Sequence, residues 1–211
     1  MKKLIVELIG TFFLVFTIGV CVVNPSAGVI APLAIGSALM VMVYAGGHIS
    51  GGHYNPAVTT AVALRGRLPL AEVPGYFIAQ LLGASLAAGA ALYLKGASQA
   101  VEAAAPVYSL GQIALAEFLF TFALAYVVLN VATAKANAGN SFYGLAIGFT
   151  VMTGAFAVGP ISGGVFNPAV ATGGLIMGLI PAGKYLVYLV VELIAGALAA
   201  LVFKTLNPED K

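Results

Sequence analysis

Two asparagines offer the clearest chemistry in this chain, because each lies in the same short motif. Segment 49–58 returns as segment 161–170, at an offset of 167 − 55 = 112, and eight of the ten positions are identical. The motifs are Asn55-Pro56-Ala57 and Asn167-Pro168-Ala169. Proline suits the first helical turn, so each asparagine is predicted to be a helix N-cap. The amide NH₂ then stays free as an uncharged hydrogen-bond donor for a small polar molecule.

The helices that begin at these motifs are predicted to be short. They run about ten residues, from Asn55 to Arg65 and from Asn167 to Gly178. At about 1.5 Å per residue, neither can cross a hydrocarbon core of about 30 Å. Each is therefore predicted to be a half-helix that enters the membrane and stops.

The composition is that of a membrane protein. Hydrophobic residues make up 61% of the 211, charged residues 8%, and the mean hydropathy is +1.05. A water-soluble domain carries about a quarter charged residues, so a soluble globule is excluded. Six segments are long enough to span a bilayer: 4–23, 28–45, 73–94, 110–131, 142–158 and 183–206. The predicted fold is an all-α membrane protein with six transmembrane helices and two re-entrant half-helices.

Charge and cysteine content exclude further classes of protein. A formal net charge of +2 is too small to indicate a nucleic-acid partner. The single Cys21 excludes an internal disulfide and a cysteine metal cluster. His48 and His53 have no third ligand at a useful spacing, so no metal site or cofactor is predicted.

The repeat predicts one channel-like domain over residues 1–211, built from copies at approximately 1–96 and 110–206. Three spans per copy is an odd number, so the second copy is inverted relative to the first. With the N-terminus inside, seven basic residues fall on the cytoplasmic side, and only Lys95 and Lys184 fall outside. The seven are Lys2, Lys3, Arg65, Arg67, Lys135, Lys204 and Lys211. This bias predicts a multi-pass protein of an inner or plasma membrane with both termini in the cytoplasm.

Carboxylates inside the spans follow the same repeat. Glu7 matches Glu117, at an offset of 117 − 7 = 110, and Gln80 matches Glu192, at 192 − 80 = 112. A buried carboxylate could relay protons, because charge in a bilayer is normally retained for a function. The interpretation we favour is structural: Glu7 and Glu117 accept hydrogen bonds from the non-helical backbone before each half-helix. His53 lies in the first of these loops and is expected to support it.

Together these motifs resemble the aquaporin and aquaglyceroporin channels, the major intrinsic proteins. The resemblance rests on the two Asn-Pro-Ala half-helices, on Ser-Gly-Gly-His before the first, and on Glu7-x-x-Gly-Thr-Phe in the first span. It implies a non-enzymatic bundle with one pore per subunit, assembled as a homotetramer. It also implies a passive channel for water and small uncharged solutes. Paired asparagine donors and two helix dipoles would exclude protons and ions.

In this family four positions form the narrowest point of the pore. Counting from the two asparagines places the equivalent positions at Ile35, Ala155, Gly164 and Val170. Most members have arginine at the last position, where this chain has valine. The predicted constriction has no charge and no side-chain donor. It should be wider than a constriction formed by aromatic residues and an arginine. It should therefore be open to glycerol-like polyols, urea or undissociated metalloid acids.

Two other classes of function remain as alternatives. A proton-coupled secondary transporter also uses inverted repeats, and its coupling residues would be the buried glutamates. An intramembrane enzyme is disfavoured, since no nucleophile with a base or histidine–glutamate metal motif occurs in the spans.

Overall fold

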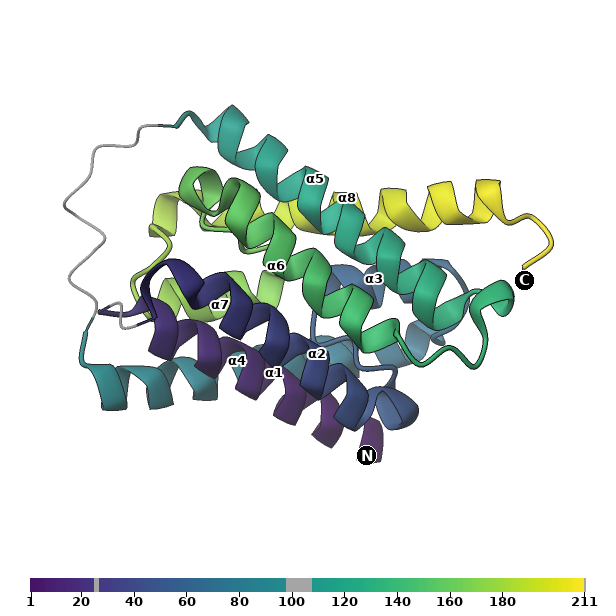
Figure 1. The fold of residues 1–211 in the computed structure, drawn as a ribbon, viewed down its shortest axis with the longest axis horizontal. Coiled ribbons are helices and arrows are strands. Elements are labelled where there is room, and N and C mark those ends of the chain that lie inside the picture. The colour runs from purple at the N-terminus through teal and green to yellow at the C-terminus, as the bar shows by residue number, and fades with distance from the viewer. Residues whose placement is uncertain (25–26, 98–107, 211) are drawn as a thin grey trace.

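A computed structural model describes residues 1–24, 27–97 and 108–210 of the protein (Figure 1). Within these ranges the chain forms helices and no β-strand. The main helices are α1 (Lys2–Val22), α2 (Ala31–Ser50), α3 (Pro56–Leu64), α4 (Val73–Lys95), α5 (Leu110–Val128), α6 (Tyr143–Ser162), α7 (Pro168–Ile176) and α8 (Ala182–Leu206). A π-helical turn, Leu129–Thr133, extends α5.

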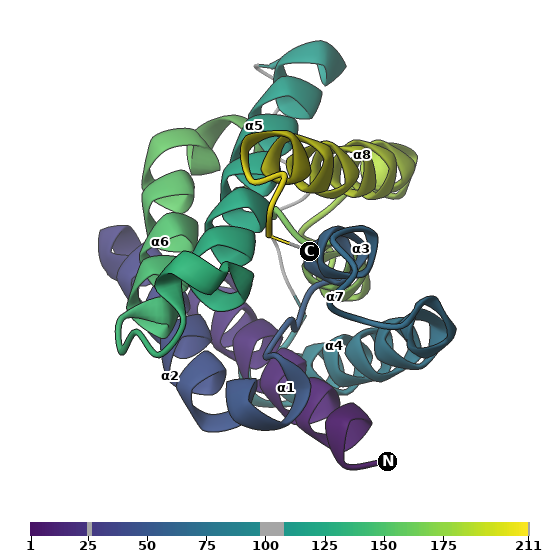
Figure 2. The same ribbon diagram turned by 90° about the vertical axis from the view of Figure 1, so that its right-hand side faces the viewer.

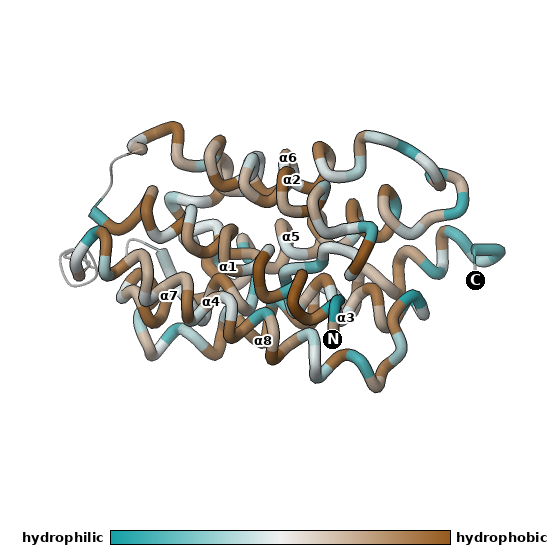
Figure 3. The backbone as a smooth tube through the Cα atoms, turned by 90° about the horizontal axis from the view of Figure 1, so that it is seen from below, coloured by the Kyte–Doolittle hydropathy of each residue, from teal (hydrophilic) through white to brown (hydrophobic). Residues whose placement is uncertain are grey.

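Six helices in the described ranges are long and apolar enough to cross a membrane, which confirms the predicted fold class. They correspond to α1, α2, α4, α5, α6 and α8, and Figure 3 shows hydrophobic colour along much of their length. The half-helices α3 and α7 have nine residues each. Two spans continue well past their predicted ends at residues 45 and 158, α2 to Ser50 and α6 to Ser162. Each ends where Gly51 or Gly163 adopts a left-handed φ of 93°.

The helices pack in two equivalent sets. In the first set α1 contacts α2 and α4, and in the second α5 contacts α6 and α8. The half-helices cross between the sets, since α3 packs on α8 and α7 packs on α4. Figure 1 shows α3 and α7 end to end along the long axis, and in Figure 2 they lie one behind the other. The N-terminal ends of both half-helices therefore meet inside the bundle.

Glycines allow the closest helix contacts. A Cβ on Gly83 of α4 would lie 2.5 Å from the carbonyl oxygen of Leu8 on α1. A Cβ on Gly36 of α2 would lie 2.7 Å from the carbonyl oxygen of Gly148 on α6. Small residues at these positions let helix backbones approach closely, and the resulting van der Waals contacts help helices associate in lipid.

Candidate functional site

Both asparagines cap their half-helices as predicted. Asn55 has an extended backbone, and its Oδ1 accepts hydrogen bonds from the amides of Ala57 at 2.8 Å and Val58 at 3.4 Å. Asn167 has nearly the same backbone conformation, and its Oδ1 accepts from the amide of Ala169 at 2.9 Å. The two caps fix both side-chain amides where α3 and α7 meet.

The asparagine NH₂ groups are not wholly free, contrary to the prediction. Asn55 Nδ2 donates to the carbonyl oxygen of Phe166 at 2.9 Å, and Asn167 Nδ2 donates to that of Tyr54 at 2.9 Å. These carbonyls lie in buried non-helical backbone and need a donor, since no water from a bilayer can supply one. An amide nitrogen carries two hydrogens, so each asparagine keeps one donor for the lumen. Each asparagine therefore also connects its half of the chain to the other half.

The residue before each asparagine is backbone-strained and tightly packed. Tyr54 and Phe166 have left-handed φ values of 48° and 52°, which non-glycine residues rarely adopt. Both side chains are about 1% exposed. The Tyr54 ring packs directly on Gly10, and the Phe166 ring fills the space where a Cβ of Gly154 would lie, 2.6 Å away. Packing thus holds the turn that aims each asparagine.

The buried carboxylates of Glu7 and Glu117 support the same turns. Glu7 accepts hydrogen bonds from the amides of His53 at 3.0 Å and Tyr54 at 2.7 Å. Glu117 accepts from the amides of Val165 at 3.0 Å and Phe166 at 2.7 Å. Glu7 also accepts from Ser50 Oγ and Gln80 Nε2, at 2.7 and 2.8 Å. These contacts favour the structural interpretation over a proton relay.

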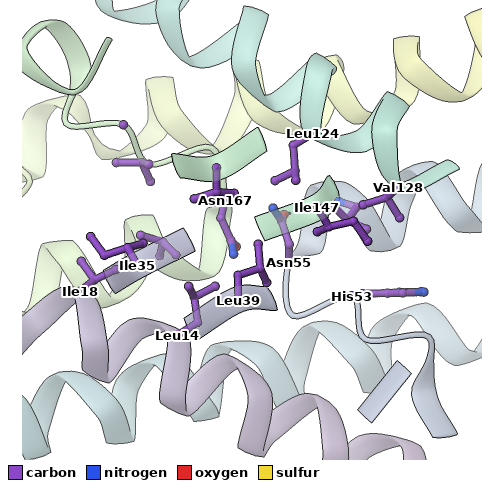
Figure 4. Close-up of a pocket in the computed structure, with 15 residues that line it drawn as sticks. Leu14, Ile18, Ile35, Leu39, His53, Asn55, Leu124, Val128, Ile147 and Asn167 are labelled. Atoms are coloured by element: carbon purple, nitrogen blue, oxygen red, sulfur yellow. Dashed lines mark hydrogen bonds between the residues drawn. The ribbon is translucent and has the colours of Figure 1, made fainter. Parts of the chain in front are cut away.

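A narrow cavity passes between the asparagines (Figure 4). Its volume is about 20 Å³, enough for a single water molecule. Of the 15 described residues that line it, only His53, Asn55 and Asn167 have polar side chains, and none of the 15 is an acid, a lysine or an arginine. The apolar lining is Leu14, Ile18, Ile35, Leu39, Val58, Leu124, Val128, Ile147, Val151, Gly164, Val165 and Val170.

Three of the four predicted filter residues line this cavity, namely Ile35, Gly164 and Val170. Ala155 is not among the lining residues and lies behind Gly164, where a Cβ on the glycine would be 3.2 Å from the Ala155 Cα. The cavity is narrower than these four positions suggest, because branched side chains from α1, α2, α5 and α6 also reach it. The sequence did not single them out: helices that are apolar on every side give no periodic signal for the lumen face.

Wider cavities follow toward the end of the bundle where α3 ends. One of about 260 Å³ shares His53 and Val128 with the narrow cavity. A second wide cavity, of about 590 Å³, shares Arg67 and Thr133 with the cavity of about 260 Å³. His53 itself is buried, and its Nδ1 lies 3.1 Å from Thr59 Oγ1, so it both lines the path and supports the loop. The shared lining residues trace one path from the asparagines to this end of the protein.

Asp210 bonds to three residues near the outer end of that path. Its Oδ1 accepts from Arg65 Nη2 at 2.6 Å and Arg67 Nη2 at 3.2 Å, and its Oδ2 accepts from the backbone amide of Lys135 at 2.7 Å. The Arg65 side chain is only 2% exposed and stacks over the Phe203 ring, 4.7 Å from its centroid. The Lys135 amide and the Arg65 guanidinium hold the pKa of Asp210 below its ordinary value. No repeat or motif in the sequence singled out Asp210.

Comparison with known proteins agrees with this architecture. The sequence profile of the major intrinsic protein family matches residues 1–203. The chain belongs to the major intrinsic protein family. It is 39% identical to a probable NIP-type aquaporin of Nicotiana alata, over 100% of this chain and 80% of the relative. It is 42% identical to aquaporin NIP1-1 of Oryza sativa subsp. japonica, over 94% of this chain and 71% of the relative.

The fold of this major intrinsic protein also matches a solved structure. The aquaglyceroporin from Plasmodium falciparum superposes with a TM-score of 0.80 at 24% identity, covering 96% of this chain and 94% of that one. Members of the major intrinsic protein family are membrane channels rather than enzymes, in line with the predicted non-enzymatic channel. Family membership gives no support to the proton-coupled transporter.

Proposed function

We propose that this chain is a passive channel for water and small uncharged solutes, such as glycerol-like polyols, urea or undissociated metalloid acids. The observation that carries the proposal is the asparagine pair in an otherwise apolar passage without charged side chains among its described lining. A neutral molecule can bind the two remaining amide donors, whereas an ion would lose its hydration shell without receiving charged or carbonyl-rich ligands in return. The relatives named aquaporin and aquaglyceroporin support the same function.

The proposed selectivity filter is the set Ile35, Ala155, Gly164 and Val170. Its support is that three of them line the cavity and the fourth packs against Gly164. Because valine replaces a guanidinium, solutes are not held by a fixed charge there. Exclusion of protons and cations then rests on Asn55 and Asn167 and on the positive ends of the α3 and α7 dipoles.

Reconstitution into liposomes tests this function. Stopped-flow shrinkage and reswelling in a series of osmolytes should show water and glycerol entering faster than in protein-free liposomes. If water passes quickly and glycerol does not pass at all, the proposal of a filter open to small uncharged solutes is wrong. Solute accumulation driven by a proton gradient would instead indicate a coupled transporter.

The proposed assembly and membrane orientation follow the family resemblance and the charge bias. We propose a homotetramer in an inner or plasma membrane, one pore per subunit, each subunit a single domain of repeats 1–96 and 110–206. The exposed apolar side chains of α4, including Ile78, Leu82 and Leu86, suit lipid or a neighbouring subunit. Mass measurement in detergent tests the tetramer. Protease protection of terminal tags in sealed vesicles tests the cytoplasmic termini.

A further inference from the structure

The carboxyl group of Glu192 on α8 has an unusual environment. Glu192 is fully buried, and neither of its carboxyl oxygens has a hydrogen-bond partner among the described residues. Helix α8 packs on α5, and the Glu117 carboxyl and the backbone amide of Asn167 are among the polar groups that face Glu192. A buried carboxylate that forms no hydrogen bond costs several kcal/mol, so the group needs a partner that these surroundings must supply.

In the first half of the chain, the position equivalent to Glu192 donates hydrogen bonds. There Gln80 occupies the place of Glu192, and its Nε2 donates to Glu7 Oε2 at 2.8 Å and to Thr59 Oγ1 at 2.9 Å. The atom that faces the buried glutamate is thus a donor. In the second half the position of Thr59 is held by Ala171, at the same offset of 171 − 59 = 112. Among the described residues, the Glu117 carboxyl is therefore the side-chain group that remains available to Glu192 on that side.

Glu117 is committed to the acceptor role. Both of its oxygens already accept backbone amides, those of Val165 and Phe166, and within the described part of the chain these amides bond to no other acceptor. Two ionised carboxylates side by side in a low-dielectric interior repel strongly, and burial penalises each of them. Only a protonated carboxyl at Glu192 can repeat the donation that Gln80 makes to Glu7.

We propose that Glu117 and Glu192 form a proton-binding site behind the second Asn-Pro-Ala motif, with one proton held on Glu192 at neutral pH. The O–H of Glu192 donates to Glu117, as Gln80 Nε2 donates to Glu7. The other titratable group that faces Glu192 is Tyr188, whose hydroxyl donates to the carbonyl oxygen of Ser162 at 2.6 Å. The half-helices α3 and α7, which also pack on α8, contain no ionisable residue.

The site makes the two halves respond differently to alkaline pH. Loss of the proton would place a second negative charge beside Glu117 and disturb the turn at Val165 and Phe166 that aims Asn167. The first half has no such response, because Gln80 does not titrate. The proton is bound rather than transported, since neither Glu117 nor Glu192 is among the described residues that line the narrow cavity.

Infrared spectroscopy of the full-length channel in an ester-free detergent tests the proton directly. At neutral pH the wild type should show the carbonyl stretch of a protonated carboxylic acid, and this band should be absent from Glu192→Gln. The band should disappear from the wild type on titration to strongly alkaline pH. Absence of the band from the neutral wild type, or its persistence in Glu192→Gln, would overturn the proposal.

The reciprocal variant keeps the test independent of how Glu192→Gln folds. Gln80→Glu builds the same carboxyl pair in the first half and should add a second protonated-carboxyl band. Water flux in liposomes, normalised to each variant's own value at neutral pH, should fall at alkaline pH in the wild type and stay level in Glu192→Gln. Equal alkaline losses in both proteins, or no added band in Gln80→Glu, would contradict the proposed pair.

Discussion

At the scale of single residues, Val170 is the position where one side chain can change what passes. It is 6% exposed and lines the narrow cavity together with Ile35 and Gly164. Val170→Arg brings a guanidinium into a space of about 20 Å³ that now has no charge among its described lining. We expect glycerol flux to fall by about tenfold or more, because the larger side chain narrows the path and binds polar solutes.

The matched control for this change is Val170→Thr, which keeps the branched side-chain shape and replaces one methyl group with a hydroxyl. Its glycerol flux should stay within about twofold of the wild type, since both side chains branch at Cβ with two heavy atoms and no charge is introduced. Stopped-flow light scattering on liposomes with equal protein content measures both variants. Unchanged glycerol flux in Val170→Arg would show that Val170 does not face the path.

Asn55 and Asn167 each cap a half-helix through Oδ1 and donate to the opposite half of the chain through Nδ2. Substitution by aspartate keeps the first role and removes the second. Aspartate keeps the oxygen that caps the half-helix but has no Nδ2 to donate to the carbonyl of Phe166 or Tyr54. Asn55→Asp should lower the free energy of unfolding by about 1–3 kcal/mol, the cost of leaving a buried acceptor unpaired. The added negative charge should also admit cations that the wild type excludes.

Asn24→Asp is the control for this chemical change. Asn24 Nδ2 also donates to a backbone carbonyl, that of Lys95 at 2.9 Å, but the residue is exposed and away from the lumen. Thermal unfolding in detergent and potassium flux in liposomes provide the two measurements. If Asn24→Asp leaks cations as much as Asn55→Asp, the asparagine pair is not the ion barrier.

At the scale of secondary-structure elements, the contact between α1 and α4 depends on Gly83. A methyl group there would lie 2.5 Å from the carbonyl oxygen of Leu8, so Gly83→Ala must push the two helices apart. We expect a loss of about 1–3 kcal/mol in the free energy of unfolding. Gly89→Ala on the same helix meets nothing within 4 Å and should be neutral or stabilising, by up to about 1 kcal/mol.

Thermal melting in one detergent, followed by size-exclusion chromatography, compares the two alanine variants. Both substitutions raise the helix propensity of α4 equally, so a difference between them reports the contact with α1 alone. Equal melting temperatures would mean that α4 can shift away from α1 without cost.

The half-helices show how an element is fixed by its partners rather than by its own sequence. A nine-residue helix is too short to be stable alone, so α3 and α7 depend on their surroundings. Each obtains its cap from its own asparagine and its packing from the opposite half of the chain, on α8 or α4. The element therefore exists only when both halves are folded together.

At the scale of the whole molecule, Asp210 connects three distant segments at one end of the bundle. It binds Arg65 at the end of α3, across 145 residues, and the backbone of Lys135 after α5. Its pKa is lowered in the folded protein, so its stabilising effect is present above the ordinary carboxyl pKa and is lost as the pH falls through the lowered value. Asp210→Asn should therefore lower the melting temperature at neutral pH, and the two proteins should converge in acid.

Glu209→Gln removes the neighbouring negative charge while it leaves the contacts of Asp210 in place. Its melting temperature should follow that of the wild type across the pH range. Melting curves of the three proteins from neutral to acidic pH provide the comparison. A constant difference between wild type and Asp210→Asn at every pH would show that the carboxylate charge is not what stabilises this end.

The sequence by itself determined the fold of this protein to a large extent. The repeat around Asn55 and Asn167, the six apolar segments and the two short ones predicted the inverted arrangement that the structure has. These features are readable because they are local: length, hydropathy and N-cap chemistry act within one segment of chain. The structural role of Glu7 and Glu117 also followed from local need, since unwound backbone in a membrane requires acceptors.

Only the tertiary structure decided which side chains meet across the two halves. It showed that Asn55 and Asn167 each donate to the opposite half, that Ala155 lies behind Gly164, and that Asp210 binds Arg65. It also showed that Leu14, Leu39 and Ile147 line the cavity, although their helices are apolar on every side. The physical reason is that the lipid-facing and lumen-facing sides of these helices are both apolar, so the sequence pattern does not distinguish them. Which side chains meet therefore depends on how the two folded halves are placed.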